Sequence, residues 1–303
     1  MPTLFYSVDA HIHASWHKHY AGAFDKTLVA QRDYLEEYQA VHKSVEWFPL
    51  WPVELHDPNK IRDIPVSFRG TFIDDIHPKR RSFFDRLSQL VEGDFGSGPY
   101  GPVYSRSKIV VNQSLRKDCN FRVFEGMGCG ALMLTPDIGR NLTELFTAGE
   151  EVVVYDDGDP DDAAQKIRWY LDHEEERLRI ARNGFHRIQK EHSAQARAHR
   201  FINILKGLRS SPSETKRISS TLAFLLTVRA FPANEREMKV RYLIPAIQMV
   251  HRYIERKAPA TPELLAVVTA IQEDCSQIGA QEHSEELLRK LVKTYPQVVH
   301  SAG

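Results

Sequence analysis

The sequence predicts an α/β fold that is followed by an all-helical C-terminal region. Segments with the composition of strands alternate with helical segments up to about residue 205. The run ALMLT at 131–135 is apolar throughout, as are strands of parallel sheets that are buried on both faces. Beyond residue 217, apolar residues recur only with the spacing of helices. These observations indicate parallel sheets with helices, joined to a helical region.

The first fifty residues alternate between strand and helix. This order predicts a βαβαβ unit, in which the strands are parallel because each helix carries the chain back to the start of the sheet. The expected strands are 3–8, 26–31 and 44–51, and the expected helices are 16–24 and 32–41.

A second α/β unit follows the polar, proline-containing stretch at 54–65. Its pattern predicts a Rossmann-like domain from about residue 60 to residue 205. Asp156, Asp157 and Asp159, followed by Pro160, form an acidic loop that we expect to cap the next helix. The expected strands or strand-like segments are 66–72, 107–114, 131–135 and 151–157, and the expected helices are 80–90, 121–130 and 161–173.

Residues 121–146 predict a helix, a glycine break, a buried strand, a loop and a short helix in succession. This arrangement is typical of the ligand-binding edge of an α/β sheet. Glu125 lies among apolar residues of the helix with no lysine or arginine four residues later, so its carboxylate is expected to meet a partner or a ligand. Gly126, Gly128 and Gly130 weaken the helix, which indicates that some group approaches the backbone closely here.

The stretch from Lys108 to Leu205 resembles the retaining GT-B glycosyltransferases of the group 1 type, and most closely their CgeB-like, spore-maturation branch. The matching text is SKIVVNQS, NFRVFEGMGCGALMLTPD, LTELFTAGEEVVVYDD, DAAQKIRWYLDHEEERLRIARNGFHRI and EHS. Weaker similarity extends upstream to Asp9. The resemblance implies metal-independent transfer of a sugar from a nucleotide-sugar donor to a glycan, protein or small-molecule acceptor. A UDP-sugar is the default expectation, with a GDP-sugar as the alternative.

A complete GT-B enzyme has two Rossmann-like domains that face one cleft, and here the first of them is short. We therefore expect a partial acceptor-side domain at 1–57, a donor-binding domain at 58–207 and a helical region at 214–303. The shortened N-terminal half implies either that the chain begins inside a longer protein or that it is a naturally shortened member of the family.

The helical region follows GLRSSPSETKR, which has the serine-rich, charged composition of a linker. Helices are expected at 218–230, 235–257, 261–278 and 281–295, separated by FPAN, KAPATP and GAQ. The last pair resembles a tetratricopeptide unit (TPR). This region is expected either to cap the enzyme domain or to bind a protein partner or a second copy of the chain.

The resemblance also implies a donor site. In the family, the glutamate that matches Glu125 hydrogen-bonds the donor ribose, and another acidic residue stands eight positions earlier, where this sequence has Lys117 followed by Asp118. The leaving diphosphate needs positive charge and free amides, which we expect from a turn at Gly70, from basic side chains and from the helix at 141–146. The residues expected to bind the donor are Gly70, Thr71, Arg80, Arg81, Arg116, Asn120, Arg122, Glu125, Asn141, Leu142 and Thr143.

Asp9, His11 and His13 follow directly after an apolar strand, where α/β sheets place ligands. In the glycosyltransferase interpretation they face the cleft and contact the acceptor or the sugar, so they are the catalytic candidates. Asp-x-His-x-His after a strand could instead hold zinc or iron, which would make the chain a metal-dependent hydrolase. Each histidine also has a plain structural explanation.

Composition narrows the function classes. Basic and acidic residues are equal in number, 40 of each, which argues against nucleic acid as a partner. The three cysteines have no metal-ligand spacing, and no metal is expected in the donor site. The N-terminus lacks a signal-peptide pattern and no apolar run reaches the ~20 residues of a membrane span, so we expect a cytoplasmic protein. A non-catalytic, nucleotide-sugar-binding scaffold remains the alternative to an enzyme.

Overall fold

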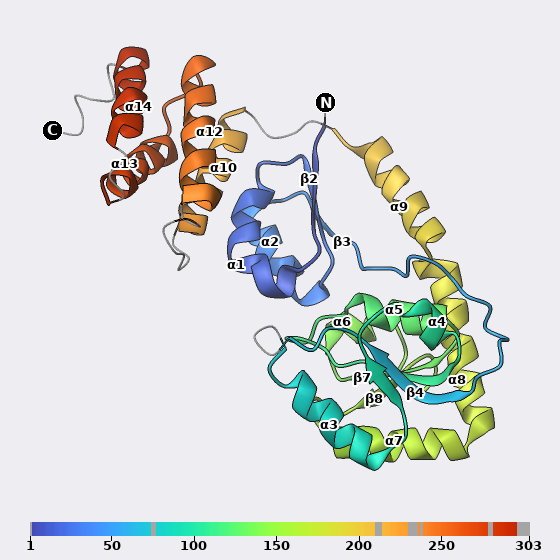
Figure 1. The fold of residues 1–303 in the computed structure, drawn as a ribbon. Coiled ribbons are helices and arrows are strands. Elements are labelled where there is room, and N and C mark those ends of the chain that lie inside the picture. Colours follow the sequence, from blue (N-terminus) through green and yellow to red (C-terminus); the bar gives the residue numbers. More distant parts are fainter. Residues whose placement is uncertain are drawn as a thin grey trace. The chain divides into compact units, whose positions relative to one another are not determined.

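The computed structural model describes residues 2–73, 77–209, 214–229, 236, 239–277 and 281–295 (Figure 1). The chain forms two compact units. The first comprises residues 1–29, 34–47 and 208–303, and the second comprises residues 30–33 and 48–207. The division into three domains at 1–57, 58–207 and 214–303 stays a prediction. Residues 210–213 of the predicted linker, the predicted break FPAN, and Gly279 and Ala280 of the predicted break GAQ lie outside the described residues.

The second unit is built on a five-stranded parallel sheet with the order β5-β4-β6-β7-β8. If the five strands are numbered 1 to 5 in the order in which they occur in the sequence, their order across the sheet is 2-1-3-4-5. This is one of the two common strand orders of doubly wound α/β folds. The parallel sheet confirms the predicted α/β fold. Its strands are β4 (Ile64–Arg69), β5 (Asp94–Gly96), β6 (Ser107–Val111), β7 (Leu132–Pro136) and β8 (Val153–Tyr155).

Helices cover both faces of this sheet (Figure 1). On one face, α3 and α7 pack side by side and bury Phe83, Leu87 and Ile167 in the core that includes Val66 and Ile109. On the other face, α5 packs against β7. The helices are α3 (Arg80–Leu90), α4 (Gly101–Tyr104), α5 (Phe121–Gly128), α6 (Arg140–Thr143), α7 (Pro160–Asp172), α8 (Glu174–Arg187), a π-helical turn (Ile188–His192) and α9 (Ala194–Gly207).

The glycines at the end of α5 make room for the protein itself. A Cβ atom at Gly126 would lie 3.1 Å from Val110 of the sheet, and one at Gly128 would lie 3.2 Å from Pro52. Gly130 has a φ of +72°, a left-handed conformation that favours glycine. The close approach that the sequence predicted is therefore made by the chain's own side chains rather than by a ligand.

Local sequence signals explain several element boundaries. The Asp159 carboxylate accepts hydrogen bonds from the amides of Asp161 and Asp162 at 2.9 and 3.1 Å, and Pro160 occupies the first turn of α7. The predicted capping of this helix is thereby confirmed. Helix α3 has the predicted bounds. Strand β5 was not predicted, because three residues that end in glycine give no strand pattern.

The first unit contains a three-stranded parallel sheet with the order β1-β2-β3. This confirms the predicted βαβαβ pattern, with one correction. Helix α1 begins at Ala10 rather than at residue 16, because the Asp9 carbonyl already accepts the amides of Ile12 and His13 at 3.0 Å. The elements are β1 (Leu4–Ser7), α1 (Ala10–Ala21), β2 (Lys26–Val29), α2 (Leu35–Val41) and β3 (Val45–Trp47). A 3₁₀ turn (Arg32–Tyr34) precedes α2 in the sequence, and its first two residues belong to the second unit.

The C-terminal helices belong to this first unit. Helix α10 packs against α1, and its Arg217 forms an ion pair of 2.7 Å with the buried carboxylate of Asp25. The predicted break KAPATP falls between α12 and α13, whereas the TPR-like character of the region stays a prediction. The helical segments are α10 (Glu214–Arg229), a π-helical turn (Lys239–Leu243), α12 (Ile244–Glu255), α13 (Pro262–Gln277) and α14 (Gln281–Thr294). Among the helices described, none is both long and apolar enough to cross a membrane.

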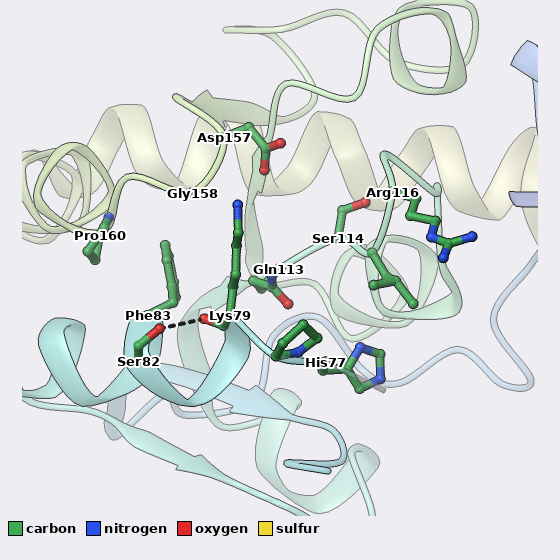
Figure 2. A pocket seen from close by; sticks show the side chains of 12 residues that line it. His77, Lys79, Ser82, Phe83, Gln113, Ser114, Arg116, Asp157, Gly158 and Pro160 are labelled. Carbon is green, nitrogen blue, oxygen red and sulfur yellow. Dashed lines mark hydrogen bonds between the residues drawn. The ribbon is translucent and has the colours of Figure 1, made fainter. Parts of the chain in front are cut away.

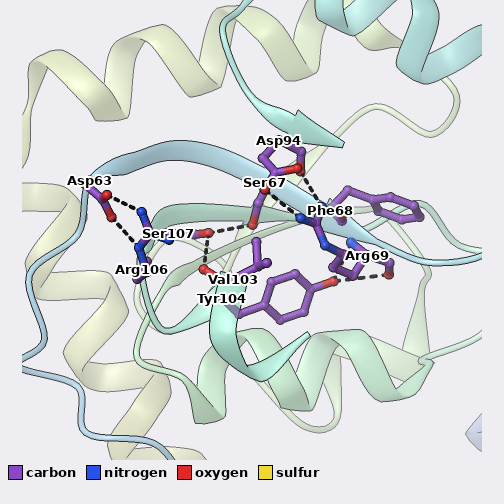
Figure 3. A network of polar contacts seen from close by, with 9 residues as sticks. All are labelled: Asp63, Ser67, Phe68, Arg69, Asp94, Val103, Tyr104, Arg106 and Ser107. Atoms are coloured by element: carbon purple, nitrogen blue, oxygen red, sulfur yellow. Dashed lines mark hydrogen bonds and ion pairs between the residues drawn. The ribbon is translucent and has the colours of Figure 1, made fainter. Parts of the chain in front are cut away.

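Hydrogen bonds from side chains link β4, β6 and α4 (Figure 3). The hydroxyl groups of Ser67 and Ser107 lie 2.6 Å apart, between the paired strands β4 and β6. The hydroxyl of the fully buried Tyr104 accepts the Arg69 amide at 2.8 Å and donates to the Arg69 carbonyl at 3.2 Å. Tyr104 therefore satisfies both backbone groups of the last residue of β4.

Replacing Tyr104 with phenylalanine should destabilise the protein by about 1–3 kcal/mol, because the part-buried Arg69 amide would lose the hydroxyl that accepts its hydrogen bond. The Arg69 carbonyl would keep its hydrogen bond from Arg122. Urea-induced unfolding followed by circular dichroism measures the loss of stability. Tyr170→Phe is the matched control, since the Tyr170 hydroxyl forms no hydrogen bond in the described part of the chain, and it should cost less than about 0.5 kcal/mol. Equal effects of the two changes would contradict the role given to Tyr104.

Candidate functional site

The strand order of the second unit fixes where a ligand can bind. The chain leaves β4 toward α3 on one face of the sheet and leaves β6 toward α5 on the other (Figure 1). In open α/β sheets, the crevice between two such strands lies at their carboxyl ends and is where ligands bind. Here the crevice is bordered by Gly70 and Thr71 after β4, and by Asn112 and Gln113 after β6.

Two arginines connect the strand ends at this crevice. The Arg122 side chain, from the first turn of α5, donates to the Arg69 carbonyl at 2.9 Å and to Asn112 Oδ1 at 2.8 Å. The Arg80 side chain, from the first residue of α3, donates to the Thr71 carbonyl at 2.8 Å and to Gln113 Oε1 at 3.0 Å. Each guanidinium group is thus hydrogen-bonded to two places: the chain at the end of β4, and the chain just after β6.

The same two guanidinium groups share one aromatic ring. Their central carbons lie 4.2 Å (Arg122) and 5.3 Å (Arg80) from the centre of the Phe68 ring, which provides a cation–π contact for both. Burial lowers the pKa of Arg80 to about 10, and the positive charge of Arg122 adds to this shift. Among the described residues, no carboxylate forms an ion pair with either arginine. The crevice therefore carries positive charge that an anionic ligand would neutralise.

Gly70 is required by this arrangement. A Cβ atom at this position would lie 2.6 Å from Nη2 of Arg122 and 2.7 Å from the Phe68 ring. A side chain at position 70 would therefore displace Arg122 from the strand end. Nη2 therefore lies beside Gly70, while Nε and Nη1 of Arg122 donate to the Arg69 carbonyl and to Asn112.

An open pocket of about 460 Å³ adjoins the crevice between the start of α3, the loop after β6 and the loop before α7 (Figure 2). The Lys79 side chain extends into this pocket, with Gln113 and Ser114 to one side of it and Asp157 beyond its tip (Figure 2). Arg116 belongs to the lining, but its guanidinium group points away from Lys79. The pocket therefore offers one ammonium group, one carboxylate and several neutral hydrogen-bonding groups.

The loop between β6 and α5 is held in a strained conformation. Arg116 and Lys117 have φ angles of +52° and +61°, which cost about 1–3 kcal/mol each for residues with side chains. The buried Asp118 carboxylate stabilises the loop by accepting the Leu115 amide at 2.7 Å and the Ser114 hydroxyl at 2.9 Å. Asp118 is thus engaged inside the loop and does not stand in for the acidic residue that the family resemblance places at position 117.

Glu125 lies one turn into α5, close to Arg122 and Tyr100. Burial raises the pKa of its carboxyl group from 4.5 to about 7, although the Arg122 charge opposes this shift. Burial also raises the pKa of Tyr100 to about 12, with a further contribution from the negative charge of Glu125. In the part of the chain that the structure describes, the Glu125 carboxylate has no hydrogen bond or ion pair. A half-buried carboxylate in this state is suited to accepting hydrogen bonds from a ligand.

Three predicted donor-binding residues have structural contacts. The Asn120 side chain accepts the Arg122 amide at 3.2 Å and caps α5. The buried Asn141 amide donates to Asp33 Oδ2 at 3.2 Å and to the Lys117 carbonyl at 2.9 Å. The exposed Arg81 donates to the Phe72 carbonyl at 2.8 Å.

The short helix α6 differs from its prediction. The sequence suggested free amides at its start, but the amides of Leu142 and Thr143 both donate to the Gly139 carbonyl, at 3.0 and 3.1 Å. Leu142 is fully buried, whereas Thr143 is exposed. The amides are engaged because a single helical turn that follows a glycine with a φ of +62° closes on itself. The ligand roles predicted for Asn141, Leu142 and Thr143 stay predictions.

The predicted catalytic candidates lie in the first unit, where Asp9 precedes α1 and His11 and His13 occupy its first turn. His17, one turn further on, lies 3.0 Å from the Ser7 hydroxyl, and burial lowers its pKa to about 4, with a contribution from His13. No group of three or more metal-ligating side chains is arranged to hold a metal within the described residues. The metal-dependent hydrolase therefore has no support, and the acceptor-side roles of Asp9, His11 and His13 stay predictions.

Asn112 is a central residue that the sequence analysis did not single out. Its amide donates to the Leu134 carbonyl at 2.7 Å, its side-chain amide donates to the Thr135 hydroxyl at 3.0 Å, and its carbonyl accepts the Tyr155 hydroxyl at 2.6 Å. A polar residue directly after the apolar strand SKIVV was the available signal. Its importance comes from its neighbours in β7 and β8, which local sequence does not identify.

The fold is the parallel-sheet α/β fold of GT-B glycosyltransferases, as comparison with solved structures shows. HepE from Anabaena, determined with UDP and glucose, aligns with a TM-score of 0.56 and 12% identity over 69% of this chain and 72% of its own. A TarM variant from S. aureus, determined with UDP, fondaparinux and alpha-GlcNAc-glycerol, aligns with a TM-score of 0.50 and 10% identity over 62% of this chain and 45% of its own.

The sequence comparison locates the similarity more narrowly. Residues 70–203 match the family model described as glycosyl transferase-like. This range begins at Gly70, directly after β4, and includes α5 and α7. No curated protein matches the chain. The family match and the fold together support a glycosyltransferase-like transferase.

The raised pKa of Glu125 predicts a pH-dependent stability. Because the folded state holds this proton more tightly than the unfolded state, the contribution of Glu125 is fully present below about pH 4.5 and is lost as the pH rises through about 7. Glu125→Gln should therefore stabilise the protein relative to wild type by about 1–2 kcal/mol at about pH 8.5, with little difference at about pH 4.5. Urea unfolding at both pH values measures the difference. Glu92→Gln, which changes an exposed carboxylate elsewhere in the second unit, is the matched control. Parallel profiles for Glu125→Gln and wild type would refute the assignment.

Proposed function

We propose that the chain is a glycosyltransferase that binds a nucleotide-sugar donor at the carboxyl edge of β4 and β6 and transfers its sugar to an acceptor. The observation that carries this proposal is the pair of guanidinium groups of Arg80 and Arg122 at the crevice, which share the Phe68 ring and form no ion pair among the described residues. A nucleoside diphosphate supplies the missing negative charge. The match of residues 70–203 to glycosyl transferase-like proteins supports the same assignment.

The two arginines would act differently on the diphosphate. Arg122 has Nη2 at the crevice beside Gly70, so it is our candidate for a direct hydrogen bond to a phosphate oxygen. Arg80 is buried and its donors are engaged by Thr71 and Gln113, so it would act through its charge and by holding the two strand ends. Positive groups fixed before the reaction stabilise the charge that grows on the leaving phosphate. Lys79, which extends into the adjoining pocket, is the further basic group within reach.

Glu125 is our candidate for the ribose contact. A half-buried carboxylate without a partner among the described residues can accept hydrogen bonds from the two ribose hydroxyl groups, and the resemblance to the group 1 family assigns this role to the matching glutamate. Hydroxyl donors favour the ionised carboxylate, so donor binding should lower the pKa of Glu125 from its raised value. The site would thus exchange a proton for the ligand near neutral pH.

The finer features of the function follow from the family resemblance. We propose a UDP-sugar donor, in line with the UDP bound to HepE, with a GDP-sugar as the alternative. We further propose a hexosyltransferase of the CgeB-like branch that retains anomeric configuration and needs no metal, because the arginines supply the positive charge. The acceptor would be a glycan, a protein or a small molecule, contacted by Asp9, His11 or His13. The TPR-like helices would bind a protein partner or a second copy in the cytoplasm.

One observation favours a second candidate, a non-catalytic protein that binds a nucleotide sugar. Position 117 carries a lysine where the family resemblance expects an acidic residue, and the neighbouring Asp118 is engaged with Leu115 and Ser114. A chain without that acidic group could bind the donor without transferring its sugar. The two candidates differ in turnover, not in donor binding.

UDP should raise the melting temperature of the purified chain, because a ligand of the folded state stabilises it in proportion to the logarithm of its concentration relative to Kd. Glu125→Ala should weaken UDP binding about tenfold or more in calorimetry, since it removes hydrogen bonds to a charged group. Glu92→Ala is the control and should leave affinity unchanged. Release of UDP from UDP-glucose in the presence of candidate acceptors then separates the enzyme from the non-catalytic candidate. Failure of UDP, GDP and their sugar conjugates to bind would overturn the proposal.

A further inference from the structure

The second unit has another pocket at the opposite edge of its sheet. This pocket has a volume of about 420 Å³ and is lined at the amino-terminal ends of the strands, where Arg62 precedes β4, Lys108 is the second residue of β6 and Gly130 precedes β7. Lys108 and Asn112 at the crevice are four positions apart, which corresponds to about 13 Å along the strand. The pocket is therefore distinct from the proposed donor site.

The lining carries an excess of positive charge. Its basic side chains other than histidine are Lys60, Arg62, Lys108, Arg177 and Arg182, and its acidic side chain is Glu174. Glu174 is already paired with Arg177, with 2.7 Å between the carboxylate oxygen and the guanidinium nitrogen. Four positive charges in the lining therefore have no negative counterpart within it.

Two of the basic side chains in the lining, Arg62 and Arg177, are fixed in place by contacts within the protein. The Arg177 side chain is only 3% exposed. The terminal nitrogens of Arg62 donate to four backbone carbonyls, including those of Ser107 at 2.6 Å and Cys129 at 2.7 Å. Burial lowers the pKa of Arg62, and the nearby charge of Arg177 contributes to the lowering. Arg62 is half-buried, and its hydrogen bonds go to carbonyl groups rather than to a carboxylate. Water and salt screen a partly buried charge less than a surface charge, so Arg62 contributes a positive potential to the pocket.

The remaining basic groups are available to a ligand. Lys60 and Arg182 are exposed and Lys108 is half-buried, and none of the three has a hydrogen bond or ion pair recorded in the described part of the chain. The apolar side chains of Leu178 and Phe185 complete the wall beside them. The volume is within the range of small-molecule sites and exceeds what a lone inorganic phosphate needs.

We propose that this pocket binds a phosphate-bearing small molecule, with Lys60, Lys108 and Arg182 holding the phosphate group and Leu178 and Phe185 contacting the rest of the ligand. Lysine and arginine are the side chains that bind phosphate through charge-assisted hydrogen bonds. The same chemistry is offered by the headgroup of an anionic phospholipid, so the test includes both sources. The proposal does not depend on the donor site at the other edge of the sheet.

The test uses the full chain and calorimetric titration with glycerol 3-phosphate and with pyrophosphate. Lys60→Gln combined with Arg182→Gln should weaken binding at least about tenfold, because two charge-assisted contacts are lost. The control is Lys43→Gln combined with Lys190→Gln, which also removes two positive charges but at positions outside the pocket lining. It should leave the affinity for both ligands within about twofold of wild type. Both double variants change exposed side chains without recorded hydrogen bonds, and their melting temperatures check that the fold is intact.

A parallel experiment measures cosedimentation with phosphatidylcholine vesicles that contain or lack phosphatidylglycerol. Binding only to the anionic vesicles, lost in the Lys60→Gln, Arg182→Gln variant, would assign the pocket to a phospholipid headgroup and support the phosphate chemistry. Binding of the soluble phosphates, lost in that variant, would assign it to a soluble ligand. No binding of any probe, or equal binding by the two double variants, would overturn the proposal.

Discussion

Beyond the paired part of β4 and β6, the chain leaves the two strands toward opposite faces of the sheet, and side chains link the diverging segments. Arg80 and Arg122 do this, and the Phe68 ring lies within cation–π distance of both. Several features depend on this contact. Position 70 has to be glycine, because a Cβ atom there would collide with the Arg122 side chain. Asn112 has to present its side-chain oxygen to Arg122, which leaves its amide group for Thr135.

The same contact links stability to function. Two guanidinium groups near one another repel, and their burial adds a desolvation cost. The carbonyl groups of Arg69 and Thr71 and the amide oxygen of Gln113 offset this cost by accepting hydrogen bonds. The positive charge is thereby built into the folded state before any ligand arrives. A site of this kind needs little rearrangement to stabilise an anion, which is the condition under which fixed charges are most effective in catalysis.

Much of the fold was predictable because its signals are local. The apolar runs of β6 and β7 and the amphipathic pattern of α3 predict those elements, and Asp159 with Pro160 predicts the start of α7. The start of α1 was missed because Ala10 and the polar residues after it give a weak helical pattern until Trp16. The short β5 acquires its strand conformation from pairing with β4, in which Ser67 pairs with Asp94 and Arg69 pairs with Gly96. The paired residues are 27 positions apart in the sequence, so no local pattern shows the pairing.

The sequence was sufficient to predict several residues of the site, but not the side chains with which those residues interact. Arg80, Arg122 and Gly70 were recognised as candidates, and the structure brings all three to the same crevice. Their partners Asn112 and Gln113 are specified by the register of β4 against β6, which no local pattern reveals. The engagement of Asp118 and of the Leu142 amide likewise arises from loop geometry that only the folded chain defines.

The two outer strands of the five-stranded sheet, β5 and β8, have only three residues each. An exposed strand edge is a template on which another extended chain can add by hydrogen bonding, and a short edge offers such a chain few backbone groups. The long, strongly apolar strands β6 and β7 lie inside the sheet, where both of their edges are already paired. This placement keeps these two apolar strands from intermolecular β-pairing once the sheet has formed.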